Sequence, residues 1–589
     1  MEEYIYNIVS SKKKQRKVGF IVLGLVIFSL AMIPTGIVLA KMLPGKSANT
    51  FSIYVDTATN STVEQTREVV SCVADEFKKE KEVLNMEMFI GQGAPLDYAG
   101  LVKGSAFKRL KSQAEIVINL TDKHHRDEPS FMMVHRLRPV VQKKCENLYK
   151  GTTVKFVEMP SGPPTYATIV VNLYGKNNLL LRTTSKIIED SLKETEGLVD
   201  VDTLQDDVYT KFEIIPNVEK IISSHLTVAQ VSNILYLAFK GNVVAIKNSS
   251  MQQDQIPIYV SLDKETRTLN HAAQHDLELK LSRLKLLNKM GIMVPVKEVI
   301  DIVPTVASPT IFKKNMRNMV SVTAECDLVS QVYPLMDARE IMIKKLEKDF
   351  TVERLTGAST YMFDLALVHK KTGDELLVRW DGEMKVSLDT FRDLGGAFIS
   401  ALVLMFLLMV VYYKSFSLSG IVLLGSFLSI IGVILGHFIT DMIALYFTGV
   451  HFYLTATSLI GFISLMGISA RSSLLLIDFT KSLIVSGIEK NRAIAISTST
   501  RAKPILLTAV AIILGSLLLA TDPIFGGLGI ALIFGSMAST AVSLFYIPVL
   551  MAKAADICPN GDAKTCSNGT GINKEHMDVT EIVPEVHNS

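Results

Sequence analysis

The feature of this sequence that most constrains its fold is the distribution of its uncharged apolar runs. One run covers residues 18–40, and about 350 mainly polar residues follow before such runs return. A helix of about 20 apolar residues spans the roughly 30 Å hydrocarbon core of a bilayer. The first run is too long for the apolar core of a signal peptide, so we expect an uncleaved membrane anchor.

The later apolar runs predict five more membrane helices. Their expected ranges are 394–413, 418–437, 454–480, 504–521 and 526–551. Basic residues precede the first run, and others lie in the connections and at the chain end expected on the same side of the membrane as the N-terminus. These residues are Lys12, Lys13, Lys14, Arg16, Lys17, Lys414, Lys481, Lys490, Arg492, Arg501, Lys503 and Lys553. Because basic residues stay on the cytoplasmic side, residues 1–17 and the tail at 552–589 are predicted to be cytoplasmic. The tail is polar from about Asp556 onward, and we expect it to be disordered.

The long segment between the first and second runs has the pattern of an external α+β domain. Alternating apolar and polar residues predict strands at 51–57, 114–120, 153–159, 167–175 and 256–262. Segments with one apolar stripe predict helices at 63–80, 137–149 and 181–195. The fold class is therefore a polytopic α-helical membrane protein, with six membrane helices arranged one plus five around βαβ modules of the ferredoxin-like kind.

Two such modules are expected in this domain. The first covers 41–162, and the proline-rich joint at 159–167 marks its end, because prolines interrupt both helices and strands. The second is formed by 163–208 and 306–393. Between these two parts, 209–305 has its own pattern of helix and strands, which predicts an inserted subdomain.

Several classes of function leave no trace in this sequence. It has no GxxxxGK[ST] phosphate loop, no GxSxG or HExxH motif and no basic recognition face, so we predict neither an enzyme, a cofactor nor nucleic-acid binding. The five cysteines are scattered without CxxC spacing. Cys558 and Cys566 could pair or hold a metal, but plain thiols are the favoured interpretation, because no histidine lies near enough to complete a zinc site.

Two short segments raise the question of a metal ion. His124 and His125 are adjacent, although a solvated turn before a helix explains them more simply. Met316 and Met319 could supply soft ligands to copper, but methionine often only fills space in a fold. We therefore predict no resident metal.

Arg471 lies near the middle of the run LMGISARSSLLLIDF. A charged side chain at that depth costs about 2.5 kcal/mol or more, and such charges usually pair and mark ion or proton paths. The acids near this run are poorly placed. Asp478 lies seven residues on, Asp441 is expected in an external loop, and Asp522 is expected at the external end of a span. The carboxylate that neutralises Arg471 should therefore come from elsewhere.

The next span contributes two more candidates. Arg501 and Thr508 are seven residues apart and share a helical face if the helix extends back to Arg501. Pro504 is compatible with a first helical turn. Arg501 could instead be an ordinary cytoplasmic basic residue, and the Thr508 hydroxyl could bond only to its own helix.

These segments resemble a known family. GFISLMGISARSSLLLIDF (461–479) and the run from RAKPILLTAVAIILGSLLLATDP onward (501–551) resemble the carboxy-terminal half of resistance-nodulation-division (RND) efflux permeases. KFVEMPSGPPT (155–165) and RWDGEMKVSLDTFRDLG (379–395) resemble porter segments of the same half.

The resemblance implies functional assignments. The two modules would be periplasmic porter subdomains, and 209–305 would be the docking subdomain. Arg471, Arg501 and Thr508 match the positions that couple to a proton-binding Asp pair in the family. Arg471 stands where drug exporters have Lys, and Lys503 replaces the usual second Arg.

The resemblance also implies partners, since usual permeases combine two such halves and the Asp pair belongs to the other one. We expect a split permease in a Gram-negative inner membrane, with a companion chain that supplies the acids and three such pairs in a trimer. A periplasmic adaptor and an outer-membrane channel are implied too. The expected activity is proton-driven multidrug efflux of hydrophobic or amphiphilic compounds. Heavy-metal export and an accessory role in protein translocation are the alternatives.

Overall fold

The computed structural model describes residues 1–557, except 160–161, 163, 252–254, 270–272 and 356–362. Part of the proline-rich joint, nearly all of the polar tail, and both Cys558 and Cys566 therefore lie outside the described residues. The chain forms two compact units. One comprises Met1–Leu204 with Lys313–Ser589, and the other is Gln205–Phe312, within which the expected insertion at 209–305 falls.

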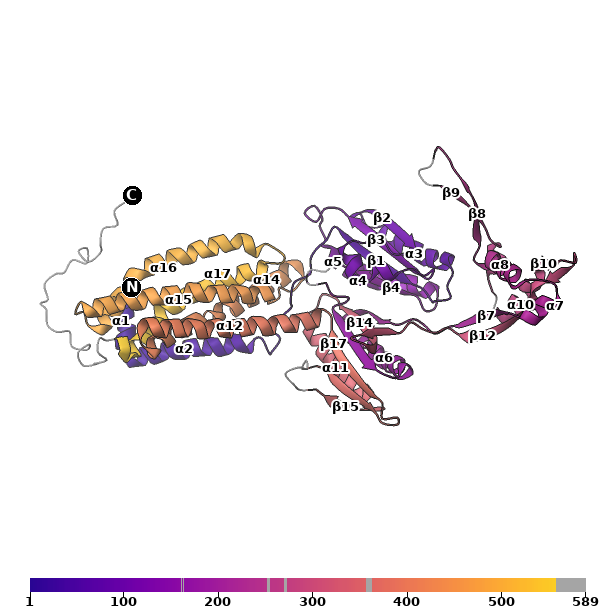
Figure 1. The fold of residues 1–589 in the computed structure, drawn as a ribbon. Coiled ribbons are helices and arrows are strands. Elements are labelled where there is room, and N and C mark those ends of the chain that lie inside the picture. The colour runs from indigo at the N-terminus through magenta and orange to yellow at the C-terminus, as the bar shows by residue number, and fades with distance from the viewer. Residues whose placement is uncertain (160–161, 163, 252–254, 270–272, 356–362, 558–589) are drawn as a thin grey trace. The chain divides into compact units, whose positions relative to one another are not determined.

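Five helical segments of the described chain are long and apolar enough to cross a membrane. They are α12 (Glu383–Tyr413), α13 (Phe416–Phe427) with α14 (Ile430–Thr448), α15 (Ala456–Val485), α16 (Lys490–Ala520), and α17 (Gly526–Ala541) continued by a π turn into α18 (Ile547–Lys553). The first expected span corresponds to α2 (Lys12–Ala31). It begins inside the basic cluster, ends well before Ala40, and runs alongside the other membrane helices (Figure 1). A sixth span therefore stays a prediction.

Two boundaries in the membrane part were predicted wrongly. α14 continues to Thr448, so Asp441 lies within a helix and not in an external loop. Its carboxylate accepts a hydrogen bond from the backbone N–H of Phe452 at 2.6 Å, which satisfies the acid locally. α16 begins at Lys490, so Pro504 lies deep inside it and not in its first turn. The polar sequence before Pro504 is helical because Ala493, Ile494 and neighbouring apolar residues are buried among the other helices.

The first module consists of β1 (Thr50–Asp56), α3 (Val63–Phe77), β2 (Val83–Ile90), α4 (Tyr98–Lys103), β3 (Gln113–Leu120), α5 (Ser130–Cys145) and β4 (Thr153–Val157). Its strands form an antiparallel sheet in the order β2-β3-β1-β4. Both long helices contribute to one core with the sheet, where Ile53, Phe77 and Met133 are fully buried. A disulfide joins Cys72 of α3 to Cys145 of α5. Stable disulfides are typical of compartments outside the cytoplasm.

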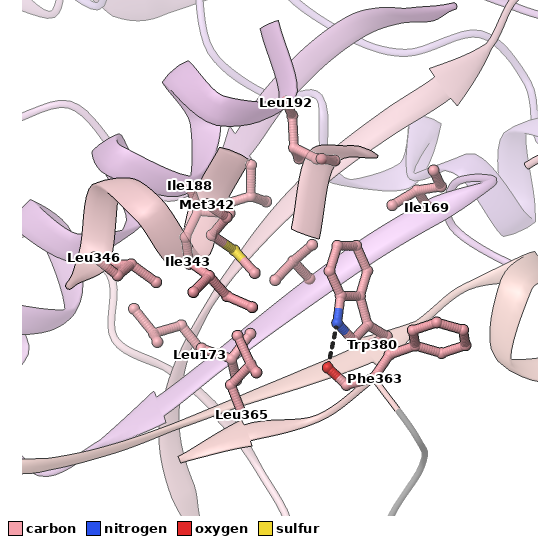
Figure 2. Packing of buried hydrophobic residues seen from close by; sticks show 14 of the residues in the cluster. Ile169, Leu173, Ile188, Leu192, Met342, Ile343, Leu346, Phe363, Leu365 and Trp380 are labelled. Carbon is pink, nitrogen blue, oxygen red and sulfur yellow. Dashed lines mark hydrogen bonds between the residues drawn. The ribbon is translucent and has the colours of Figure 1, made fainter. Parts of the chain in front are cut away.

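The second module is built from two separate stretches of the chain. Its elements are β5 (Ile169–Gly175), α6 (Asn178–Lys193), β6 (Leu198–Leu204), β13 (Phe312–Lys314), β14 (Arg317–Cys326), α11 (Val332–Leu346), β15 (Phe350–Arg354), β16 (Leu365–His369) and β17 (Glu375–Asp381). All of the strands belong to one sheet. Its core contains Trp380, the single tryptophan of the chain. The indole N–H of Trp380 donates to the Phe363 carbonyl at 2.9 Å, which satisfies the one polar atom of that ring (Figure 2).

The inserted unit has a small core of its own, around Ile221, Val231 and Leu281. It contains β7 (Thr210–Pro216), α7 (Val218–Ser223), α8 (Val228–Phe239), β8 (Asn242–Lys247), β9 (Ile256–Val260), α9 (Lys264–Arg267), α10 (Ala273–Arg283), β10 (Lys285–Leu287), β11 (Met293–Pro295) and β12 (Ile300–Val306). β7 pairs with β12 over their full length, so the chain enters and leaves this unit through one two-stranded ribbon (Figure 1).

Candidate functional site

Arg471 lies halfway along α15. The helix begins with a capping box, in which the hydroxyl of Thr455 accepts from the Ser458 backbone and the side chain of Ser458 accepts from the Thr455 backbone. Sixteen residues into this helix, Arg471 is exposed on the surface of the chain. No ion pair within the described part of the chain involves its guanidinium.

The residues around Arg471 form one open face of α15. Ile460, Ser464, Gly467 and Leu475 are all exposed and recur at helical spacing with Arg471. A side-chain carbon added at Gly467 would meet nothing within 4 Å. We call these five residues the open face.

Two neighbouring helices border the open face. On one side, the hydroxyl of Tyr413 in α12 donates to the Leu474 carbonyl at 3.3 Å. On the other side, the hydroxyl of Ser497 in α16 donates to the Leu476 carbonyl at 3.0 Å. The open face therefore lies between α12 and α16, which Figure 1 shows on the two sides of α15.

The contact between Ser497 and Leu476 shows which residues of α16 and α15 lie at the same depth. α15 and α16 are joined by a short connection and run in opposite directions, so positions can be counted from that contact. Arg501 lies about 6 Å further along α16 and Arg471 about 7.5 Å back along α15, at 1.5 Å per residue. The two arginines therefore lie at nearly the same depth. Thr508 lies about 10 Å further along α16, toward its carboxy-terminal end.

Arg501 and Thr508 both lie in α16, as their spacing requires. The guanidinium of Arg501 stacks on the ring of Phe479 in α15, 4.8 Å from its centroid. Its Nε is buried and has no hydrogen-bond partner among the described residues. Thr508 is exposed, and its hydroxyl donates to the Ile505 carbonyl at 2.9 Å, so it bonds to its own helix in this structure.

The three aspartates considered above as partners of Arg471 are engaged elsewhere. Asp478 accepts from the Tyr412 hydroxyl at 3.3 Å. Asp441 also contacts the Nδ1 atom of His451 at 3.1 Å. Asp522 accepts from the backbone N–H groups of Ile524 and Phe525. The geometry therefore provides a membrane-embedded cation without a counter-charge in the described chain.

A second group of charges, which the sequence analysis missed, lies where the two α+β modules meet. Arg138 of α5 donates to Asp200 at 3.2 Å and to Asp327 at 2.7 Å. Lys103 donates to Glu325 at 2.6 Å. The remaining pairs are Lys155 with Asp202 and His135 with Asp327. In all of these pairs the first module supplies the basic side chain and the second supplies the acid.

The alternating acids of LVDVDTL (198–204) were a signal for this interface. Asp200 and Asp202 recur at strand spacing, which places two carboxylates on one face of β6. A small hollow of about 50 Å³ lies among these charges, and Tyr54 and Tyr166 also line it. Burial raises the pKa of the nearby Glu158 to about 7, against the opposing effect of Arg138.

The metal candidates do not come together into a ligand set. His124 and His125 lie exposed in a turn before α5. Met316 is exposed at the turn between β13 and β14, and Met319 is half-buried in β14 beside the hydroxyl of Ser321. No group of three or more His, Cys, Asp or Glu side chains suited to a metal occurs within the residues described.

Comparisons with known proteins agree with this architecture. The AcrB/AcrD/AcrF family matches residues 2–555. The swarming motility protein SwrC of Bacillus subtilis is 24% identical over 385 residues, which are 64% of this chain and 32% of SwrC. The cobalt-zinc-cadmium resistance protein CzcA of Cupriavidus metallidurans is 32% identical over 114 residues, which are 18% of this chain and 10% of CzcA. The multidrug export protein AcrF of Escherichia coli is 29% identical over 153 residues, which are 25% of this chain and 14% of AcrF.

A solved heavy metal efflux pump has the same fold. It superposes with a TM-score of 0.69 at 16% identity, over 93% of this chain and 51% of the pump. The chain therefore spans about half the length of that protein and about a third of SwrC. With a family match over nearly its whole length, the chain belongs to the AcrB/AcrD/AcrF family of resistance-nodulation-division permeases.

Proposed function

We propose that this chain is the carboxy-terminal-type half of a proton-driven exporter for hydrophobic or amphiphilic compounds. One observation carries the proposal: Arg471 is exposed at mid-membrane depth on an open face with no counter-charge in the described chain. An unpaired charge in a bilayer is costly, so a second helical body that brings acids is needed. A companion permease half supplies them, as an Asp pair.

The exposed membrane surface supports a companion of this kind. In α12 no residue of the apolar window is buried, and in α16 only 22% are, compared with 67% for α13 with α14. Of the five candidate spans, the two that border the open face are therefore the least covered by their own chain. A companion that packs between them would bury Arg471 and leave the other helices unchanged.

In the proposed cycle, protonation of the companion's acids changes their attraction for Arg471. Ionised acids hold the guanidinium, and protonation weakens that hold and lets the side chain move. Arg501 lies at the same depth and can share the acids, while the Thr508 hydroxyl serves as a relay. The β-α-β-β-α-β order of the first module supports its role as a porter subdomain, and the inserted unit would be the docking subdomain.

The proposed assembly is a trimer of such pairs in the inner membrane, with the α+β modules in the periplasm and both termini in the cytoplasm. The disulfide between Cys72 and Cys145 supports a periplasmic location for the first module. A periplasmic adaptor and an outer-membrane channel would complete the export path.

Purification of a tagged chain from native membranes tests the proposal. We expect a second permease half to copurify, and reconstituted pairs to export substrate under an imposed proton gradient. Recovery of the chain alone, competent for transport, would contradict the need for a companion.

Export of heavy-metal cations is the second candidate. The similarity to CzcA and to the solved heavy metal efflux pump favours it. Deletion of the gene distinguishes the two: sensitivity to metal ions without sensitivity to hydrophobic drugs would support metal export.

A further inference from the structure

The amino-terminal end of α2 carries a basic surface that none of the proposed roles uses. Lys13, Lys14, Arg16 and Lys17 line an open, shallow hollow on the side of this helix together with Phe20 and Ile21. None of these four basic residues forms an ion pair with a described residue. Their charge is therefore available to a ligand.

The surface faces away from the protein. Gln15 lies on the opposite side of the helix, where it is buried and donates to the Val9 carbonyl at 2.5 Å. Lys13, Lys17 and Phe20 follow one another at helical spacing on the outer side. A side-chain carbon added at Gly24, one turn further on, would meet nothing within 4 Å.

The backbone adds to the attraction for an anion. Ser11 precedes the helix without a side-chain hydrogen bond to it, and the first turn contains no acid. The first N–H groups of a helix lack partners inside the helix and carry a partial positive charge, so they favour a phosphate. Uncapped N–H groups, four basic side chains and an apolar wall thus occur within three turns of one helix.

From these features we infer that this end of α2 binds an anionic phospholipid of the adjacent leaflet. The phosphodiester lies among Lys13, Arg16 and Lys17, and the acyl chains lie along Phe20 and Ile21 toward Gly24. Basic clusters beside a membrane helix attract anionic headgroups, and the apolar wall favours a lipid over a soluble anion. The inference depends on α2 lying in the membrane, but not on the transported substrate or on the proton path.

Native mass spectrometry of the purified full-length chain tests the inference. Phosphatidylglycerol or phosphatidylcholine is added, and the retained lipid is measured as a function of concentration. We expect clear preference for phosphatidylglycerol. The variant K13Q/K17Q should bind it about twenty-five-fold more weakly, because each interfacial lysine contributes about fivefold.

The matched control is K12Q/K553Q, which removes the same charge from residues that do not line the hollow. It should retain phosphatidylglycerol like the unmodified chain. Equal losses in the two variants would overturn the inference, because they would indicate a diffuse attraction by net charge. Equal retention of both lipids, or competition by inorganic phosphate as strong as by the lipid, would overturn it too.

A third variant separates the acyl chains from the headgroup. F20A keeps every charge. We expect it to weaken retention of phosphatidylglycerol while leaving the weak competition by inorganic phosphate unchanged. If F20A retains the lipid unchanged, the proposed path of the acyl chains is wrong.

Discussion

The junction between the two α+β modules and the membrane face around Arg471 differ in whether their charged side chains form ion pairs. At the junction, Arg138 contacts two carboxylates, and each module supplies what the other lacks. On α15, Arg471 has no ionic partner among the described residues. At the junction the charges pair within one chain, whereas on the membrane face the proposed partner of Arg471 belongs to a companion chain.

This difference in charge pairing indicates which parts of the chain can be stable without a partner chain. A buried ion pair that loses one partner costs about 3–5 kcal/mol, so complementary charges at the junction hold the modules in one arrangement. The same physics acts against an isolated α15, since its charge lies at the depth of the hydrocarbon. The chain should therefore fold its external modules by itself and need a companion for its membrane helices.

The largest expected effect is on transport. In the proposed cycle, R471A removes the cation that the companion's ionised acids would hold, so efflux under an imposed proton gradient should fall to background. The complex should still assemble and bind substrate, because the open face remains apolar. R471K should retain partial function, since the charge stays but the planar donor geometry is lost. Efflux by R471A at the unmodified rate would show that Arg471 is only structural.

The next effect is on stability at the module junction. R138A leaves Asp200 and Asp327 without their shared cation, and we expect the external modules to lose about 3–5 kcal/mol. Thermal unfolding of the full-length protein, followed by a probe in the first module, measures this loss. R136A is the matched control, because Arg136 on the same helix pairs with Glu80 and Glu128 at a more exposed site. Equal losses in both variants would contradict the special role of the junction.

A smaller effect is expected from pH. Because burial raises the pKa of Glu158 to about 7, the folded chain binds an extra proton there between the ordinary glutamate pKa and pH 7. Stability should therefore fall as pH rises through this window, by about 2–3 kcal/mol between pH 5 and pH 8. E158Q removes this contribution, so its unfolding temperature should change less over the same range. An identical pH dependence in both proteins would exclude Glu158 as the cause.

The smallest effect is expected from T508A. In this structure the Thr508 hydroxyl bonds only to its own helix, so its loss removes a relay but no charge. We expect efflux to fall by about threefold to tenfold, corresponding to about 1 kcal/mol. T521A is a suitable control, since Thr521 makes a similar bond to its helix at the far end of α16.

The sequence predicts well what depends on local composition. The apolar runs identify the membrane helices because few charges interrupt them, and Arg471 is conspicuous for the same reason. The boundaries of α14 and α16 were missed, since a hydrogen bond to Asp441 and the burial of Ala493 and Ile494 depend on neighbouring elements.

The missed contacts are distant in the sequence. Cys72 and Cys145 are 73 residues apart, and only the packing of α3 beside α5 brings them together. Lys103 and Glu325 are separated by more than two hundred residues and belong to different modules. Amphipathic patterns predict which side of an element is buried, but not which residue of another element lies opposite.

Photo-crosslinking from the open face tests the central claim most directly. A photoreactive amino acid in place of Gly467 projects where nothing lies within 4 Å, and the same residue in place of Gly24 on α2 is the control. After irradiation of native membranes, we predict that position 467 crosslinks to a second permease half, at a segment that carries its intramembrane acids. Position 24 should crosslink to lipid alone. If position 467 also reaches only lipid while the protein transports, then no companion covers Arg471 and the account is wrong.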